Sequence, residues 1–475
     1  MIFFALFSSR RITIAGPGGR TGRAASFHRS PLTSVEIDHA QTVSTMSDAA
    51  RPFMGPRIVA VSFFGSLATY GVIMAVVGNF VGPIGATFSV PPTTIGLSLG
   101  ILTLILGVLG PLVGRAIDSG HTRVMMALGA AVVGCGLLLL ARATTFTQLV
   151  LCFLCLVAPG LAFCGHIATA GLITSWYRRN RGLMMGLALT GPTFAMWIGP
   201  FFVESIMQVA DWRTAMSALG AVILVVVAPL YGWLLVARPE FAGQAPDGKP
   251  QSAEPESGEA LDQGAAAHDG ELAALGTTDL LKMPGLWIAS LGLGLLLTSG
   301  AVLIPLLIRY AETGLGIEPI KAVHFYLVMI PFSILGKITI GRVADIAPLK
   351  PVLAVAVLLN LLVWAVLYLE PGYALFLVTG AIYGLGFGGL PPLQQFLMGR
   401  LFGRANFGRA SGIGGVMVML LVAGANFGSQ GYLGATGSYA HAFVAQMAVI
   451  ALGGALLASL KIPNPTSPAR IPTNG

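Results

Sequence analysis

A lysine stands inside a long apolar stretch of this chain. Lys337 belongs to a run of Ile, Leu, Phe and Gly residues from about 321 to 341. An ammonium group within hydrocarbon costs roughly 2.5 to 3.5 kcal/mol on insertion scales, so it normally faces a polar cavity or a partner. In a water-accessible cavity it would attract a negatively charged small molecule, and desolvation would ease the loss of its proton. The alternative is a structural lysine that extends to the nearby membrane surface.

Other polar side chains within apolar runs are candidates to line the same cavity. The imidazole of His166 can take up a proton near neutral pH or hydrogen-bond a substrate. Glu204 is the only acid in such a run, so a relay of buried carboxylates is not expected, and a proton would travel with the substrate or through His166 or Lys337. Each candidate also fits a structural role between helices. The further candidates for substrate binding are Tyr70, Asn79, Trp197, Tyr383, Gln394 and Asn426.

Two polar phrases each occur twice at nearly the same spacing. Gly-Arg-Ala-Ile-Asp at 114–118 returns 227 positions later as Gly-Arg-Val-Ala-Asp at 341–345. Trp-Tyr-Arg-Arg-Asn-Arg-Gly at 176–182 is echoed at an offset of 226 by Phe-Gly-Arg-Ala-Asn-Phe-Gly at 402–408. Two unrelated phrases that repeat together indicate an internal duplication. Charged residues between apolar runs must face water, so these phrases predict tight turns between membrane helices.

The composition indicates a membrane protein. Of 475 residues, 55% are hydrophobic and 10% are charged, whereas a soluble chain of this length needs about a quarter charged. Twelve apolar runs of about 20 residues, six before a polar gap and six after it, predict an all-α membrane protein with twelve transmembrane helices in two six-helix bundles. The expected organisation is an N-terminal extension (1–54), a first bundle (55–236), a linker (237–283), a second bundle (284–461) and a tail (462–475).

Charge and cysteine usage exclude other classes. The net charge of +8 comes from cations placed between apolar runs, so no nucleic-acid partner is expected. The four cysteines also lie in apolar runs and are interpreted as packing residues. We find no cluster of metal ligands, no nucleophile with a base nearby in sequence and no phosphate-binding Gly-Lys-Ser/Thr loop. The sequence therefore predicts no enzyme, no metal and no cofactor.

The distribution of bases predicts the orientation. Of the 27 Lys and Arg residues, four fall on the side opposite the termini: Arg142, Arg213, Arg309 and Lys321. Basic loops stay in the cytoplasm, so both termini, the acidic linker and the repeated turns are expected there, with the protein in the plasma (bacterial inner) membrane. The basic segment 1–54 is open to three interpretations: a transit-like leader, a disordered tail, or an extension upstream of a later start at Met46 or Met54.

The repeated turns, the six-plus-six arrangement and the linker resemble the major facilitator superfamily. The resemblance implies two bundles that expose a central site alternately to each side of the membrane. It also implies that the acids of the turns meet cations and helix ends across the cytoplasmic interface and hold that face shut. The residues implied for this gate are Gly114, Asp118, Arg123, Arg178, Gly341, Arg342 and Asp345.

The phrase at 176–182, with Asp-Trp-Arg at 211–213, resembles the monocarboxylate and oxalate/formate branch of that family. There, a cation one turn before the Gly of the second turn is thought to meet the substrate carboxylate, and Lys337 has that position. Ser333 stands where eukaryotic members carry an Asp. The expected protein is a monomeric secondary transporter for a small organic anion, with a proton as potential co-substrate. The alternatives are a carrier for neutral or hydrophobic compounds and a non-transporting membrane sensor.

Overall fold

The structure, a computed structural model, describes residues 52–248, 275–436 and 438–462. The expected N-terminal extension and C-terminal tail lie almost entirely outside these residues, as does the middle of the expected linker. Within the described ranges the regular structure consists of helices, without strands. The all-α fold class predicted from the sequence is confirmed.

Twelve helical crossings account for the described helices. Ten stretches are long and apolar enough to cross a membrane. One of them, Tyr373–Leu433, has 61 residues, three times what a bilayer requires, and it is interrupted at Gly403, whose φ of 68° is left-handed. It therefore supplies two crossings. The helical segment from Gly55 to Phe88 adds the twelfth.

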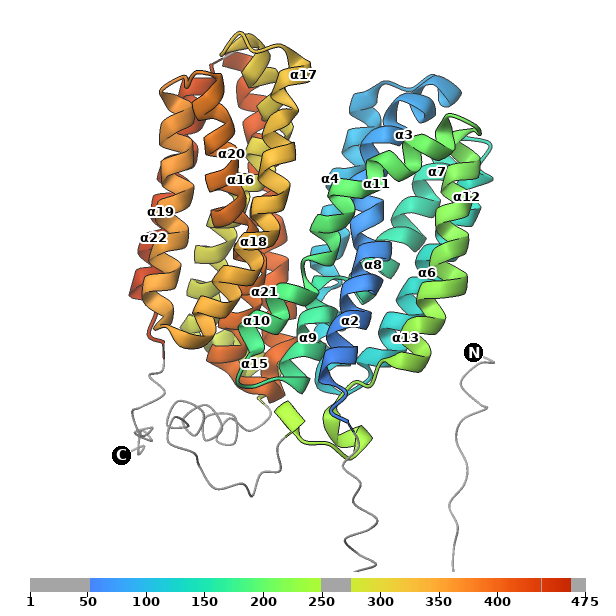
Figure 1. Cartoon of the computed structure of the whole chain (residues 1–475), viewed down its shortest axis with the longest axis vertical. Helices are drawn as coiled ribbons and strands as arrows, with labels where there is room; N and C mark the ends of the chain where they lie inside the picture. Colours follow the sequence, from blue (N-terminus) through green and yellow to red (C-terminus); the bar gives the residue numbers. More distant parts are fainter. Residues whose placement is uncertain (1–51, 249–274, 437, 463–475) are drawn as a thin grey trace, which may run out of the picture. The chain divides into compact units, whose positions relative to one another are not determined.

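The first six crossings form the N-terminal bundle (Figure 1). Several consist of two or more helical pieces, because Pro, Gly or a π-turn interrupts the α-helical hydrogen bonds. Their bounds are α2 Gly55–Ser66, η1 Leu67–Gly71 and α3 Val72–Phe88; α4 Pro92–Val108 and α5 Gly110–Asp118; α6 Thr122–Ala141; α7 Phe146–Cys152, η2 Phe153–Val157, α8 Ala158–Cys164 and α9 His166–Trp176; α10 Arg181–Ala188 and α11 Gly191–Met207; α12 Trp212–Val222, η3 Ile223–Val227 and α13 Ala228–Leu234.

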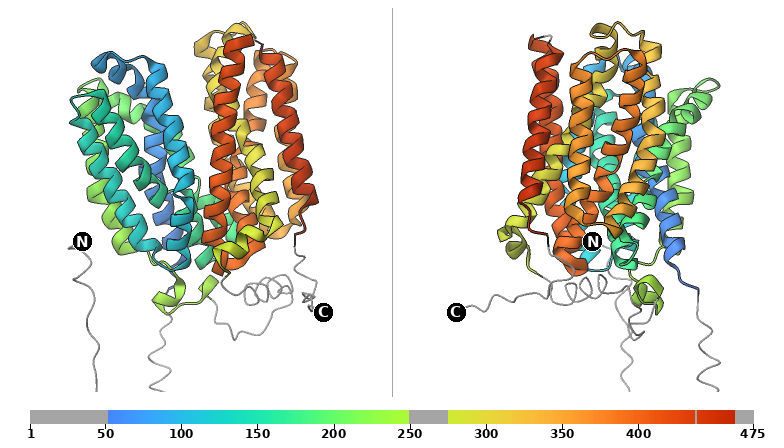
Figure 2. Two further views of the ribbon diagram at one scale, coloured as in Figure 1. Left: turned by 180° about the vertical axis from the view of Figure 1, so that it is seen from behind. Right: turned by 60° about the vertical axis from the view of Figure 1, so that its left-hand side comes forward.

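The last six crossings form the C-terminal bundle, in which α16 packs against both α21 and α22 (Figure 2). Its helices are longer and less interrupted. Their bounds are α16 Pro284–Thr313; α17 Pro319–Ala322 and α18 His324–Ile346; α19 Leu349–Tyr368; α20 Tyr373–Gly388; α21 Leu390–Thr436; and α22 Tyr439–Ser459. Between the bundles the structure describes two short 3-10 turns, η4 Pro239–Ala242 and η5 Pro246–Gly248, and the helix α15 Thr277–Lys282.

Large apolar side chains are found both inside and outside the bundles. Trp176, Trp364 and Tyr231 are fully buried, whereas Leu358 and Val225 are more than 60% exposed. Exposed side chains of this kind have no place on a water-soluble surface but match a lipid environment. The chain is therefore a multi-pass integral membrane protein.

The two bundles belong to one compact unit that begins at Phe53. They meet through α5 with α21 and through α10 with α18. These are the elements that carry the two repeated phrases, so the duplicated segments of one half pack on those of the other.

Candidate functional site: the interface between the bundles

The crossing of α5 and α21 brings two backbones into direct contact. A Cβ atom added to Gly114 would lie 2.1 Å from the carbonyl oxygen of Gly408, and one added to Gly408 would lie 2.2 Å from that of Gly114. One turn further along, Gly110 and Gly412 meet in the same way. Only glycine permits this approach, because any side chain would overlap with the main chain of the opposite bundle.

The crossing of α10 and α18 repeats this geometry with the halves exchanged. A Cβ on Gly182 would lie 2.2 Å from the carbonyl oxygen of Gly341, and one on Gly341 would lie 2.3 Å from that of Gly182. Next along the crossing, a Cβ added to Gly186 would lie 2.3 Å from the backbone carbonyl oxygen of Lys337. Each crossing therefore joins the first repeated phrase of one half to the second phrase of the other.

Asp118 connects the halves at the first crossing. Its carboxylate accepts hydrogen bonds from the backbone N–H groups of Gly408 (2.7 Å) and Arg409 (3.0 Å), and from Nε of Arg409 at 3.0 Å. The side chain is 3% exposed. A buried carboxylate is tolerated when its oxygens are satisfied in this way, and these bonds exist only while the two bundles touch.

Asp345 makes the equivalent contact at the second crossing. It accepts hydrogen bonds from the N–H groups of Gly182 (2.7 Å) and Leu183 (2.9 Å), the second and third residues of α10. The N–H groups of a first helical turn have no partner within the helix, and the helix dipole favours an anion there. Beside it, Arg342 donates to the side-chain oxygen of Asn180 at 2.9 Å, another bond between the halves.

Lys337 makes a third polar contact between the halves. Its side chain is buried, and its ammonium donates to the carbonyl oxygen of Leu189 at 3.0 Å and to Oγ1 of Thr193. Leu189 is the C-cap of α10, where helical carbonyls lack partners and the dipole favours a cation. The lysine thus lies at the bundle interface, with both of these acceptors in the N-terminal bundle.

Two other arginines of the predicted gate have different surroundings. Nε of Arg123 donates to the carbonyl oxygen of Gly232 at 2.7 Å, which places it beside α13 in its own half. The backbone N–H of Arg178 donates to a carboxylate oxygen of Asp247 at 3.0 Å. The structure joins Asp118 to Arg409, a residue that the sequence did not single out as its partner.

Most of the predicted cavity residues fall into three groups. Tyr70 lies in the π-turn η1, and its ring meets that of His166 edge-on, with 6.3 Å between the ring centroids. His166 begins α9 directly after Gly165, where extended backbone interrupts the fourth crossing. Interrupted helices of this kind line the central sites of many transporters.

The second group is a pair, in which the amide of Asn79 donates to Glu204 at 3.4 Å. The third group is in the C-terminal bundle. The hydroxyl of Tyr383 is 3.5 Å from that of Ser299, and the amide of Asn426 donates to the carbonyl of Ala301 at 3.1 Å. Both contacts are with α16, as is expected of residues that hold helices together.

The remaining two candidates differ in exposure. Gln394 is buried, with 5% of its surface exposed, whereas Trp197 is 39% exposed. The indole ring of Trp197 packs edge-on against Phe194 on its own helix, α11.

The beginning of the expected linker also contacts both halves. Arg238 donates to the backbone carbonyl of Asp118, and Glu240 forms two hydrogen bonds with the Arg404 guanidinium at 2.8 and 2.9 Å. Burial on its own would raise the pKa of the Glu240 carboxyl, but the bonds from Arg404 outweigh it, so that this pKa is lower than usual. Sequence gave no sign of this contact, because acidic linkers are ordinarily solvated.

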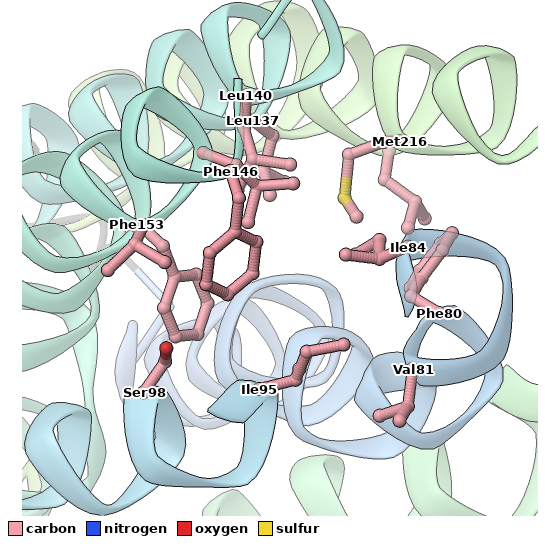
Figure 3. Close-up of a pocket in the computed structure, with 13 residues that line it drawn as sticks. Phe80, Val81, Ile84, Ile95, Ser98, Leu137, Leu140, Phe146, Phe153 and Met216 are labelled. Carbon is pink, nitrogen blue, oxygen red and sulfur yellow. The ribbon is translucent and has the colours of Figure 1, made fainter. Parts of the chain in front are cut away.

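An apolar pocket lies within the N-terminal bundle, between α3, α4, α6, α7, η2 and α12 (Figure 3). Its volume is about 660 Å³ with the open mouth included. Figure 3 shows Phe80, Ile95, Phe146 and Met216 turned towards it, with the Ser98 hydroxyl at its edge. None of the predicted substrate-binding residues lines it, and its walls offer nothing to hold a charge. Among the described residues, no cluster of three or more His, Cys, Asp or Glu side chains suits a metal.

The fold and this interface are those of a membrane transporter with two related halves. The model of the Major Facilitator Superfamily matches residues 59–425, and the chain belongs to this family. The resemblance seen in the sequence is thereby confirmed, and membership of this family agrees with the expectation of a transporter that is not an enzyme.

Two known proteins match part of this chain in sequence. A segment of 146 residues is 27% identical to monocarboxylate transporter 1 of Mus musculus, and one of 166 residues is 24% identical to an MFS-type transporter of Gibberella moniliformis. These matches cover 30% and 32% of this chain and only 29% and 38% of the relatives' own lengths.

Two solved structures are similar over nearly the whole fold. The human organic anion transporter MFSD10 gives a TM-score of 0.65 at 12% identity, covering 86% of this chain and 100% of that one. The fucose:proton symporter of E. coli gives 0.64 at 15% identity, covering 87% and 100%.

Proposed function

We propose that this transporter carries a small organic anion, with a monocarboxylate as the preferred substrate, and that Lys337 binds its carboxylate. The observation that carries the proposal is the burial of this ammonium between two neutral acceptors, the Leu189 carbonyl and the Thr193 hydroxyl. A buried cation without a carboxylate among these partners is incompletely neutralised, and an anionic substrate would complete it. The partial match to a monocarboxylate transporter supports the same substrate class.

The other predicted cavity residues have supporting roles in this proposal. His166 and Tyr70, whose rings meet edge-on, form one side of the site. His166 is also the group through which a proton could accompany the anion. Asn79, Trp197, Tyr383, Gln394 and Asn426 contribute polar or aromatic lining from both bundles.

The two crossings act as the gate in this proposal. Asp118 and Asp345 hold the bundles together at the end that carries the repeated turns, with Gly114, Gly341 and Arg342 at the points of contact. The surplus of basic residues assigns that end, and both termini, to the cytoplasm of a plasma (bacterial inner) membrane. The carrier works as a monomer and alternates between a closed and an open gate.

Uptake of labelled solutes into proteoliposomes tests this proposal. The panel contains monocarboxylates, dicarboxylates, sugars and a neutral apolar compound, for wild type, Lys337→Ala, Lys337→Arg and the control Lys321→Ala. Lys321 is an exposed lysine paired with Glu318, so its loss should leave uptake unchanged. Loss of a charged hydrogen-bonding group costs about 1.5 to 3 kcal/mol, so Lys337→Ala should lower monocarboxylate uptake roughly tenfold to a hundredfold.

Lys337→Arg keeps the charge and should retain part of the uptake, because a planar guanidinium fits the same site poorly. Uptake of a sugar or an apolar compound that Lys337→Ala leaves unchanged would refute the substrate class. Monocarboxylate uptake that survives Lys337→Ala would refute the site.

A further inference from the structure

Helix α18 holds the short helix α10 of the opposite half at both of its ends. Asp345 accepts from the N–H groups of the first turn of α10, and Lys337 donates to the carbonyl of its C-cap. α10 has eight residues, which span about 12 Å at 1.5 Å per residue. Asp345 follows Lys337 by eight positions on α18, so the acid and the base are separated by the same length. The anion meets the positive end of the α10 dipole and the cation meets its negative end.

The other crossing, between α5 and α21, has no cation at the position equivalent to Lys337. Counting back 227 positions from Lys337, the spacing of the repeated turns, leads to Gly110, which has no side chain and packs its backbone on Gly412. That crossing is held by Asp118, which pairs with Arg409 of the opposite half. Lys337 therefore distinguishes two otherwise similar contacts, and it is also the residue proposed to bind the substrate anion.

The present acceptors of Lys337 are both uncharged. A carboxylate brings a full negative charge to the ammonium, so it binds this group more strongly than a neutral carbonyl or hydroxyl does. A carboxylate that reaches Lys337 would therefore replace the Leu189 carbonyl and the Thr193 hydroxyl. When it does, the C-terminal end of α10 loses its hydrogen bond to Lys337, and the bonds that remain are those of Asp345 and Arg342 at the opposite end of the helix.

We propose that Lys337 is a latch that the substrate anion releases, with Thr193 as the positioning residue that keeps the latch closed in the empty carrier. This inference rests on the proposed anion-binding role of Lys337. It adds that substrate binding and the closed gate compete for the hydrogens of one ammonium group. The empty carrier keeps this face closed, and the carboxylate of the substrate shifts the equilibrium towards the open face.

The experiment measures the distance between spin labels at Arg179 and Ile346, which are both exposed and flank the α10–α18 contact from opposite halves. The labels are placed in a chain whose native cysteines are replaced by alanine. L-lactate serves as the anionic probe and lactamide as its neutral isostere. Wild type should show mainly the short distance alone and with lactamide, and a larger open fraction with lactate.

Thr193→Val removes the hydroxyl but keeps the shape and Lys337. It should raise the ratio of open to closed carriers roughly tenfold to a hundredfold without any ligand, as expected for loss of one hydrogen bond to a charged group. Thr193→Ser should restore the wild-type ratio. Thr190→Val is the matched control, because that hydroxyl bonds to Leu187 in its own half and should not affect the latch. Lys337→Met should be open without ligand and insensitive to lactate.

Two failures are distinguishable. If lactate shifts the wild type but Thr193→Val has the wild-type open fraction, the latch is refuted while anion binding at Lys337 stands. If Lys337→Met responds to lactate as wild type does, and takes it up equally well, the proposed function itself is refuted.

Discussion

Replacement of Gly408 by alanine should weaken the closed gate without affecting the fold of either bundle. The added Cβ would lie 2.2 Å from the carbonyl oxygen of Gly114 and 2.6 Å from a carboxylate oxygen of Asp118. Ordinary contact requires more than 3 Å, so the two helices must separate by about 1 Å. That separation also lengthens the bonds from Gly408 and Arg409 to Asp118, which are 2.7 and 3.0 Å long.

The magnitude follows from these contacts. Overpacking of this kind costs about 1 to 3 kcal/mol. The cost falls on the closed state alone, because the open state separates the two glycines. The ratio of closed to open carriers should therefore fall roughly 5- to 150-fold. The control is Gly424→Ala on the same helix, where an added Cβ meets nothing within 4 Å.

The labels at Arg179 and Ile346 also provide the assay for this prediction. Gly408→Ala should show a larger open fraction than wild type, and Gly424→Ala should match wild type. Both variants should keep the wild-type thermal stability within a few degrees. An unchanged distance distribution in a folded Gly408→Ala protein would refute the argument that backbone contact sets the closed state.

Two further predictions concern charges at the same face. Asp118→Asn should open the gate more than Asp345→Asn, as measured by the same label pair, because it also removes the charge that pairs with Arg409 across the crossing; equal effects would show that the ion pair contributes little. The pKa of Glu240 is lowered in the folded state, so its bond to Arg404 contributes stability above the ordinary carboxyl pKa of about 4.3 and loses it as the pH falls through the folded value. Glu240→Gln should therefore lower thermal stability less at pH 3 than at pH 7, and a drop that is the same at both pH values would contradict this.

The sequence predicted the fold because a bilayer leaves few choices. Apolar runs of about 20 residues must be helices, and the two phrases that repeat at offsets of 227 and 226 made the duplication visible. The positions of Gly114 and Gly341 at close crossings follow from the same pattern. The two acids were recognised by their place in the turns and by their resemblance to the family.

The partners of these residues were harder to predict. Asp118 bonds to Arg409, and Lys337 to Leu189 and Thr193, through contacts between halves that are more than a hundred positions apart. The acceptor at Leu189 is a main-chain carbonyl and the acceptor at Thr193 is a common hydroxyl, so neither can be recognised as a partner of Lys337 from a single sequence. The one available signal was the repeat itself, since exchange of the halves relates Gly408 and Arg409 to Gly182 and Leu183.

The reciprocal pattern of the glycines has a consequence for how such an interface arises. In an isologous dimer, if residue i of one subunit touches residue j of the other, then j also touches i. Gly114 with Gly408 and Gly341 with Gly182 obey this rule once the two halves are treated as subunits. The surface that joins them is thus of the kind that two copies of one six-helix polypeptide would form. Lys337 and Gly110 are equivalent positions of the two halves, and here fusion into one chain has allowed the copies to differ.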